Sequence, residues 1–139
     1  MTTFLIVLAV LIAAAFAYVR LAPLPGDRIG RAGETREVGT YPTEGGFTAV
    51  VEVAEGAAAL AALRKVALDT PRTEALSEAD AAVQSFVTRS RIWGFPDITN
   101  AWIAEGRLHV SAHLVYGRKD FDVNRSRVEA WLERANLRS

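Results

Sequence analysis

The polar side chains that could carry chemistry lie in two short stretches of the chain. The first leads into a Gly-Phe turn, and the second opens a helical pattern near the C-terminus. The candidate residues are Arg89, Arg91, Asp97, Asp120, Asn124, Arg125 and Arg127. Guanidinium groups bind carboxylates and phosphates through paired hydrogen bonds, and a helix N-terminus adds amide donors. If both stretches meet at one end of a sheet, they predict a polar pocket for an anion, such as an anionic lipid headgroup or a small carboxylate.

The same residues also fit a structural network in which arginine–aspartate pairs and an asparagine fix two turns onto the helix. Asn124 falls on the apolar stripe of that helix, where a buried amide must be hydrogen-bonded. Asp97 and Asp120 offer a third hypothesis, acid–base catalysis by a hydrolase or isomerase. Paired acids near arginines are more often salt-bridged and ionised, so the sequence favours a non-catalytic role over an enzyme.

Metal, cofactor and nucleophile signatures do not occur in this sequence. His109 and His113 are four residues apart on a predicted strand, which separates them by roughly 13 Å, too far for one ion. No serine-nucleophile motif, phosphate-binding glycine loop or dinucleotide fingerprint is present, so we expect no cofactor. The absence of cysteine excludes disulfides and thiolate chemistry. Sixteen basic and sixteen acidic residues cancel, which argues against a nucleic-acid partner.

Hydrophobic periodicity predicts the elements that would position the candidate residues. A period of two, typical of strands, covers 82–93, 98–104 and 108–114, and a β-branched run predicts an edge strand at 47–53, with a further short strand near Thr73. Helical spacing predicts helices at 56–68 and 121–136. This order of elements indicates an α+β fold, a small antiparallel sheet covered on one face by two helices.

Two details of these elements bear on the site. On the strand at 108–114, the side chains of His109, Ser111 and His113 share the face away from the helices, so they should face water or a ligand. At the start of the last helix, Asp120 or Asp122 can supply the N-cap oxygen.

An unbroken apolar run near the N-terminus predicts a membrane anchor. With its flanks the run covers residues 4–21, about 18 residues or roughly 27 Å of helix, enough to cross a bilayer. A cleaved signal peptide is the alternative, because Ala15-Phe16-Ala17 has the form of a cleavage site. We therefore divide the chain into an anchor at 1–22, a linker at 23–46 and one globular domain at 47–139, the linker being rich in Gly, Pro, Thr, Arg and Glu and without apolar periodicity.

Two motifs resemble those of a known family. They are the run from Arg89 to Asp97, with its Arg-Ser pair and Gly-Phe-Pro-Asp turn, and the run from Gly117 to Arg127. The paired motifs resemble the domain of unknown function 1499, over roughly 57–137, which implies a small envelope-associated or lumenal domain of undetermined activity. The chain departs from that pattern at Asp122, where the family usually has Gly, and at 109–113, where it usually has an Arg-Ser-x-Ser-Arg run.

The side of the membrane stays open at this point. Arginines at 20, 28, 31 and 36 follow the apolar run, and the positive-inside rule then favours a cytoplasmic domain. The family resemblance instead implies a periplasmic one.

Three functions are consistent with the sequence. We favour a membrane-tethered, non-catalytic binding or interaction module with an arginine-rich polar site. The alternatives are an envelope enzyme using Asp97 or Asp120, and a purely structural envelope component that meets its partners through the edge at 47–53. Trp93, Phe95, Trp102 and Tyr116 could form an aromatic rim at the membrane surface or pack in the core and turns.

Overall fold

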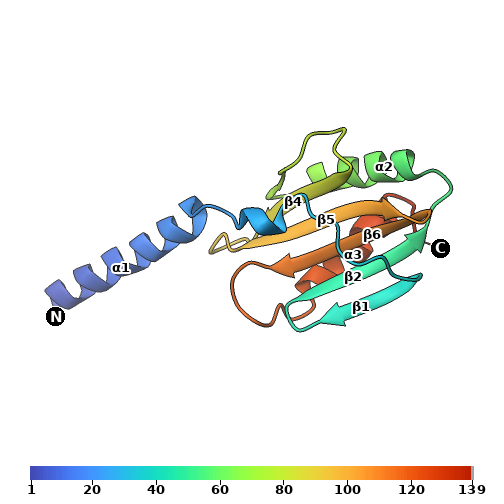
Figure 1. Ribbon diagram of the computed structural model, residues 1–139. Coiled ribbons are helices and arrows are strands. Elements are labelled where there is room, and N and C mark those ends of the chain that lie inside the picture. The colour runs from blue at the N-terminus through green and yellow to red at the C-terminus, as the bar shows by residue number, and fades with distance from the viewer. Residues whose placement is uncertain (139) are drawn as a thin grey trace.

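Six antiparallel strands form one sheet in the computed structural model, which describes residues 1–138 (Figure 1). The strands are β1 (Gly39–Thr43), β2 (Gly46–Glu52), β3 (Thr73–Ala75), β4 (Val83–Arg89), β5 (Pro96–Ala104) and β6 (Arg107–Leu114), and the helices are α1 (Thr2–Leu21), the 3-10 turn η1 (Gly26–Arg28), α2 (Gly56–Leu68) and α3 (Val123–Arg134). The order across the sheet is β1-β2-β6-β5-β4-β3. The predicted α+β class is confirmed.

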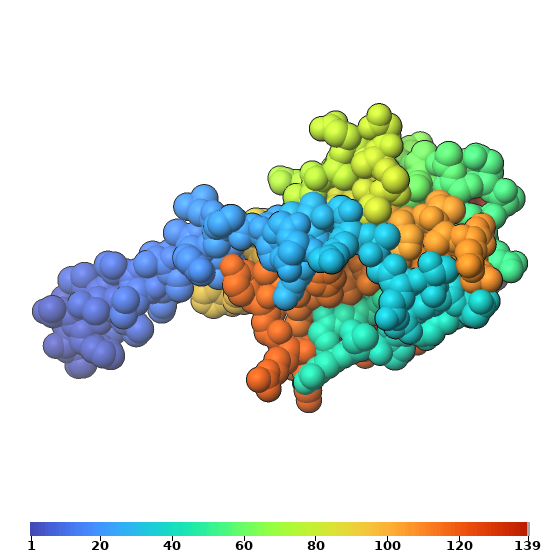
Figure 2. All heavy atoms as spheres, in the orientation of Figure 1, coloured from blue at the N-terminus to red at the C-terminus, as the bar shows by residue number. Residues whose placement is uncertain are grey.

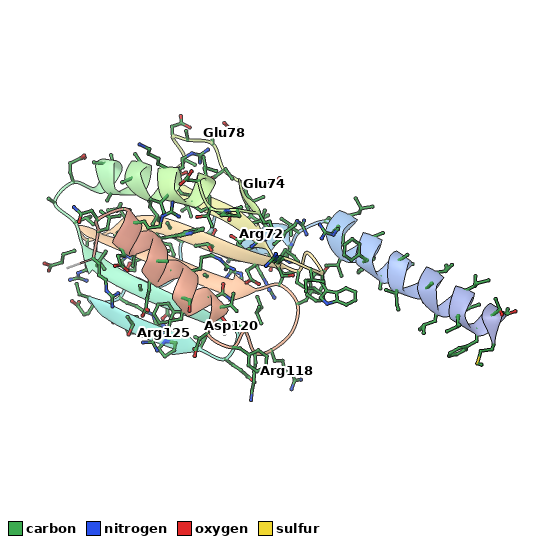
Figure 3. All side chains as sticks on the ribbon, turned by 180° about the vertical axis from the view of Figure 1, so that it is seen from behind. Arg72, Glu74, Glu78, Arg118, Asp120 and Arg125 are labelled. Atoms are coloured by element: carbon green, nitrogen blue, oxygen red, sulfur yellow. The ribbon has the colours of Figure 1, made fainter. Side chains whose placement is uncertain are left out.

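Helices α2 and α3 lie side by side on one face of the sheet (Figure 3). In α2 the buried residues are Ala59, Leu63 and Ala67, spaced four apart on one face. The Glu55 carboxylate accepts a hydrogen bond from the Ala58 amide at 3.1 Å and so caps the first turn. Small alanines on the buried stripe let this helix approach the sheet closely.

The core lies between these helices and the sheet. Leu108, Val110 and Ala112 of β6 point into it, as their alternation predicts. Trp131 of α3 is 1% exposed and contacts Phe86 of β4 edge to face, with the ring centroids 5.7 Å apart. The expected stripe of α3 is therefore the one that packs on the sheet.

Helix α1 stands apart from the sheet and has no buried residue (Figure 1). It is long and apolar enough to cross a membrane, although an N-terminal signal sequence would meet the same criterion. Its last turn adjoins the 90–95 turn, because Arg20 Nη2 donates to the Ile92 carbonyl at 3.2 Å. The apolar helix and the end of the sheet are therefore in direct contact.

Residues 23–46, predicted to be a linker without order, contain η1 and β1 and run along the sheet. We call residues 29–38 the strap, because they cross the face opposite to α2 and α3 (Figure 2). The Gly30 amide donates to Ser85 Oγ at 2.8 Å, and the Arg36 amide donates to His109 Nε2 at 3.0 Å. Polar side chains of the sheet hold the strap by its backbone, so its own sequence needs no apolar period.

Strand β2 is not the sheet edge that its sequence predicted. Strand β1 pairs with its outer side, with Tyr41 opposite Thr48. The edge on this side of the sheet is therefore β1, and a structural partner could not add a strand directly to β2.

The polar face of β6 is covered at His109, whereas Ser111 and His113 on the same face are half-buried. His109 is 0% exposed, stacks on Trp102 with 5.2 Å between ring centroids, and accepts the strap amide. The expectation that His109 faces solvent or a ligand is wrong, because the strap occupies this face. Trp102 is 5% exposed and belongs to this covered layer, not to a rim.

Candidate functional site

Four of the seven candidate residues meet at one end of the sheet, on the side of α2 and α3. Asp97 begins β5, and Asp120, Asn124 and Arg127 come from the loop before α3 and its first turns. Arg127 Nη1 and Nη2 both lie 3.3 Å from Asp97 Oδ2, and Nη1 donates to Asn124 Oδ1 at 2.7 Å. The guanidinium thus ties the end of the sheet to the helix.

Asp120 supplies the helix cap. Its Oδ2 accepts the Asn124 amide and its Oδ1 accepts the Asp122 amide, each at 3.1 Å. Asp122 occupies the N-cap position with φ 65° but makes no cap bond with its own side chain. Of the two capping residues considered, Asp120 is therefore the one that satisfies the free amides.

Asn124 contacts Arg127 instead of pinning a turn. Its side chain is completely buried and lies on the apolar stripe, as expected. Within residues 1–138 its Nδ2 has no hydrogen-bond partner. The predicted hydrogen bonding of this buried amide is therefore found only for its oxygen, which accepts from Arg127.

Burial raises the pKa of the Asp97 carboxyl above the ordinary aspartate value of 3.8. The charge and hydrogen bonds of Arg127 oppose this shift, and the nearby Asp120 carboxylate adds to it. Removal from water therefore outweighs the ion pair, a balance that buried pairs commonly show.

We expect NMR titration of the Asp97 carboxyl to give a pKa above 3.8, and Arg127→Gln to raise it further by removing the opposing charge. A raised pKa in the folded state means that protonation favours folding. The stability from this group is fully present below the unfolded-state pKa and is lost as pH rises through the folded-state pKa. Arg125→Gln is the control, because Arg125 binds Glu129 instead, and an equal shift in both variants would contradict the assignment.

A cavity of about 440 Å³ opens beside this cluster. We call it the loop pocket, since its walls come mainly from the 90–95 turn and the 115–122 loop, both at the α1 end of the sheet (Figure 1). It is lined by Ser90, Phe95, Asp97, Leu114, Tyr116, Gly117, Lys119, Asp120, Phe121, Val123 and Arg127. Apolar side chains form most of the wall, and charged groups lie at its base and rim.

Three candidate residues, Arg89, Arg91 and Arg125, lie outside the cluster of Asp97, Asp120, Asn124 and Arg127. Arg89 pairs with Pro96 across the sheet, so Asp97, one residue further on, points to the opposite face. Arg89 Nη1 donates to the carbonyls of Gly94 at 3.0 Å and Val19 at 3.3 Å. The arginine-rich convergence predicted from the sequence is therefore wrong for Arg89.

Arg91 and Arg125 are also separate from the cluster. Strand β4 ends at Arg89, so Arg91 lies exposed in the following turn and not on the predicted strand. Arg125 Nε binds Glu129 at 3.1 Å, and its guanidinium lies 5.6 Å from the centroid of the Phe47 ring, on the exposed side of α3 (Figure 3).

The apolar wall of the loop pocket was not predicted from the sequence. Phe121 is 89% exposed and has φ 51°, and Lys119 is exposed beside it. A large apolar residue inside a Gly- and Asp-rich turn was the one signal that could have indicated it, because such turns are ordinarily polar.

The chemistry of this site is ion pairing and apolar contact. Within residues 1–138, no three His, Asp or Glu side chains converge as metal ligands would. Asp97 is engaged by Arg127, and Asp120 by two backbone amides.

A family model described as "Protein of unknown function (DUF1499)" matches residues 36–134. No curated protein matches the chain. The matched region begins in the strap and extends from β1 to the end of α3, so it contains the whole sheet and every residue that lines the loop pocket.

Proposed function

Because the chain belongs to the DUF1499 family, whose description assigns no activity, we propose a function from the geometry of its site. We propose that the protein is a single-pass, membrane-anchored, non-catalytic binding module. Its loop pocket takes a lipid-like amphiphile, a molecule with an apolar body and an anionic headgroup. The observation that carries the proposal is an apolar-walled pocket with a charged rim at the same end of the sheet as the apolar helix.

The pocket offers different contacts to the two parts of such a ligand. Phe95, Leu114, Tyr116 and Val123 supply an apolar wall, which suits an acyl chain or another apolar body. Lys119 at the rim is exposed and forms no ion pair within the described residues, so its ammonium can meet a phosphate or carboxylate. This arrangement moves the expected anion contact from Arg89 and Arg91 to Lys119.

The catalytic alternative rests on the raised pKa of Asp97, a feature also common in active sites. Acid–base work would need a carboxyl group able to exchange protons with a substrate. Asp97 is instead held by Arg127, and both oxygens of Asp120 accept backbone amides. Because both carboxylates already have partners, we favour a binding role over catalysis.

Native mass spectrometry of the full-length protein in mild detergent tests the proposal. We expect one bound lipid that is lost on Lys119→Gln with Tyr116→Ser, since the first change removes the rim charge and the second removes part of the wall. Lys65→Gln is the matched control, because Lys65 is exposed on α2 away from the pocket. Lipids held by α1 alone would survive in every variant, and a protein whose bound mass is the same in all variants would contradict the proposal.

A further inference from the structure

Exposed apolar side chains are concentrated at one end of the domain. Within the described residues after α1, that is residues 22–138, eight large apolar side chains are exposed, and six of them lie on the 92–95 and 116–123 segments. The six are Ile92, Trp93, Phe95, Tyr116, Phe121 and Val123, and the other two are Val38 and Leu68. Clusters of this kind on an otherwise polar surface mark interaction sites.

This cluster adjoins the last turns of α1. The ring centroids of Phe16 and Trp93 are 6.3 Å apart, and Arg89 Nη1 donates to the Val19 carbonyl at 3.3 Å. Gly94 has φ 74°, and a Cβ there would lie 2.9 Å from Arg20 Cζ, so the turn fits closely against the helix. The 90–95 turn is therefore held at a fixed position along the axis of α1, beside its last turns.

This position places Trp93 close to the surface of a bilayer that α1 would span. Phe16 lies five residues before the end of α1 at Leu21, about 7.5 Å along the helix axis. A bilayer spanned by α1 must extend to the level of Phe16 if its apolar core is to cover the helix, and the centroid of the Trp93 ring lies 6.3 Å from that of Phe16. Side chains of peripheral helices enter the headgroup–acyl boundary to a similar depth, about 5 to 10 Å.

The chemistry of the two segments suits this boundary. Trp, Tyr and Phe have an apolar body, and Trp and Tyr add a polar tip, which is why these two are enriched at membrane interfaces. Arg91, Arg118 and Lys119 are exposed among them, and Arg118 extends away from the domain (Figure 3). Basic side chains near a bilayer surface are attracted to anionic lipids.

We infer that the 90–95 turn and the 116–123 segment are inserted in the interfacial layer of the bilayer that α1 spans. The inference rests on the anchoring role of α1 in the proposed function. Insertion holds the end of the sheet against the membrane and opens the loop pocket at headgroup level. An amphiphile could then enter the pocket without crossing water.

Site-directed spin labelling tests this inference directly, because the chain has no native cysteine. Single variants Ile92→Cys and Phe121→Cys carry a nitroxide in full-length protein in nanodiscs of phosphatidylcholine and phosphatidylglycerol. Val38→Cys is the matched control, an exposed apolar site next to Gly39, which pairs with Val50 toward the opposite end of the sheet, and Leu11→Cys reports on α1. We expect the ratio of oxygen to nickel-chelate collision rates to be several-fold higher at 92 and 121 than at 38, and highest at 11.

Two outcomes would overturn the inference in distinguishable ways. A high ratio at 11 with ratios at 92 and 121 equal to that at 38 would leave α1 as an anchor and place the loops in water. A low ratio at 11 would remove the anchor and the inference together. All four positions are exposed, so the label is tolerated without disturbing the core, and circular dichroism of each variant confirms the fold.

Discussion

The Trp131→Ala substitution is expected to lower the free energy of unfolding by about 3 to 5 kcal/mol. Trp131 is 1% exposed and packs edge to face on Phe86, so its removal leaves a cavity between α3 and the sheet. Chemical denaturation of the full chain in detergent micelles, followed by circular dichroism, measures the loss.

Glu133→Ala provides the control for that measurement. Glu133 is on the same helix but exposed, so its change should alter the stability by less than about 0.5 kcal/mol. Equal effects of the two substitutions would mean that α3 does not pack as described.

The Arg127→Met substitution should cost about 3 kcal/mol, because it leaves the Asp97 carboxylate buried without its partner. The side chains of Arg127 and Asp97 are only 12% and 9% exposed. Replacing both, as Asp97→Val with Arg127→Met, should recover the part of the loss that comes from Asp97, since the raised pKa of Asp97 indicates that desolvation already outweighs the attraction. The buried Asn124 Oδ1 lacks its Arg127 donor in both variants, so that part of the loss remains. Unfolding midpoints of the three variants give the coupling between the two residues.

Arg125→Met is the matched control for this cycle. Arg125 is 52% exposed, and its pair with Glu129 should contribute less than about 1 kcal/mol. A double variant that is no more stable than Arg127→Met would show that Asp97 does not cause the loss.

The regular elements of this fold could be predicted because their periodicity records burial on one side. The alternation at 108–114 gave β6 and its core face, and the stripe through Val128 and Trp131 gave α3. Both patterns follow from side chains meeting the same core.

The strap and β1 could not be predicted in this way. The strap is ordered by backbone amides bound to Ser85 and His109, residues far away in the sequence, so no local pattern records it. Strand β1 is ordered by its pairing with β2, and its own sequence has no apolar alternation. For the same reason the covered face of β6 was expected to be open.

The site was predictable in part. The helix cap by Asp120 and the nearness of Asp97 to the start of α3 follow from turn and cap chemistry. Arg89 could not be placed from the sequence, because its face depends on its partner across the sheet. Arg89 pairs with Pro96, and the next residue, Asp97, therefore lies on the opposite face. Asp122, where the resembled pattern has Gly, adopts φ 65°, a conformation that Gly takes without strain and Asp tolerates.

If α1 anchors the protein in a membrane, as proposed, the course of the strap decides how the domain resists a pull on that helix. A pull on α1 enters the domain at the membrane end, and the strap runs from there along the sheet toward the far end (Figure 1). The bonds at Gly30 and Arg36 therefore lie along the line of force and share the load in shear, instead of opening one after another. A pull along α1 is then resisted by bonds to both β4 and β6, not by one strand alone.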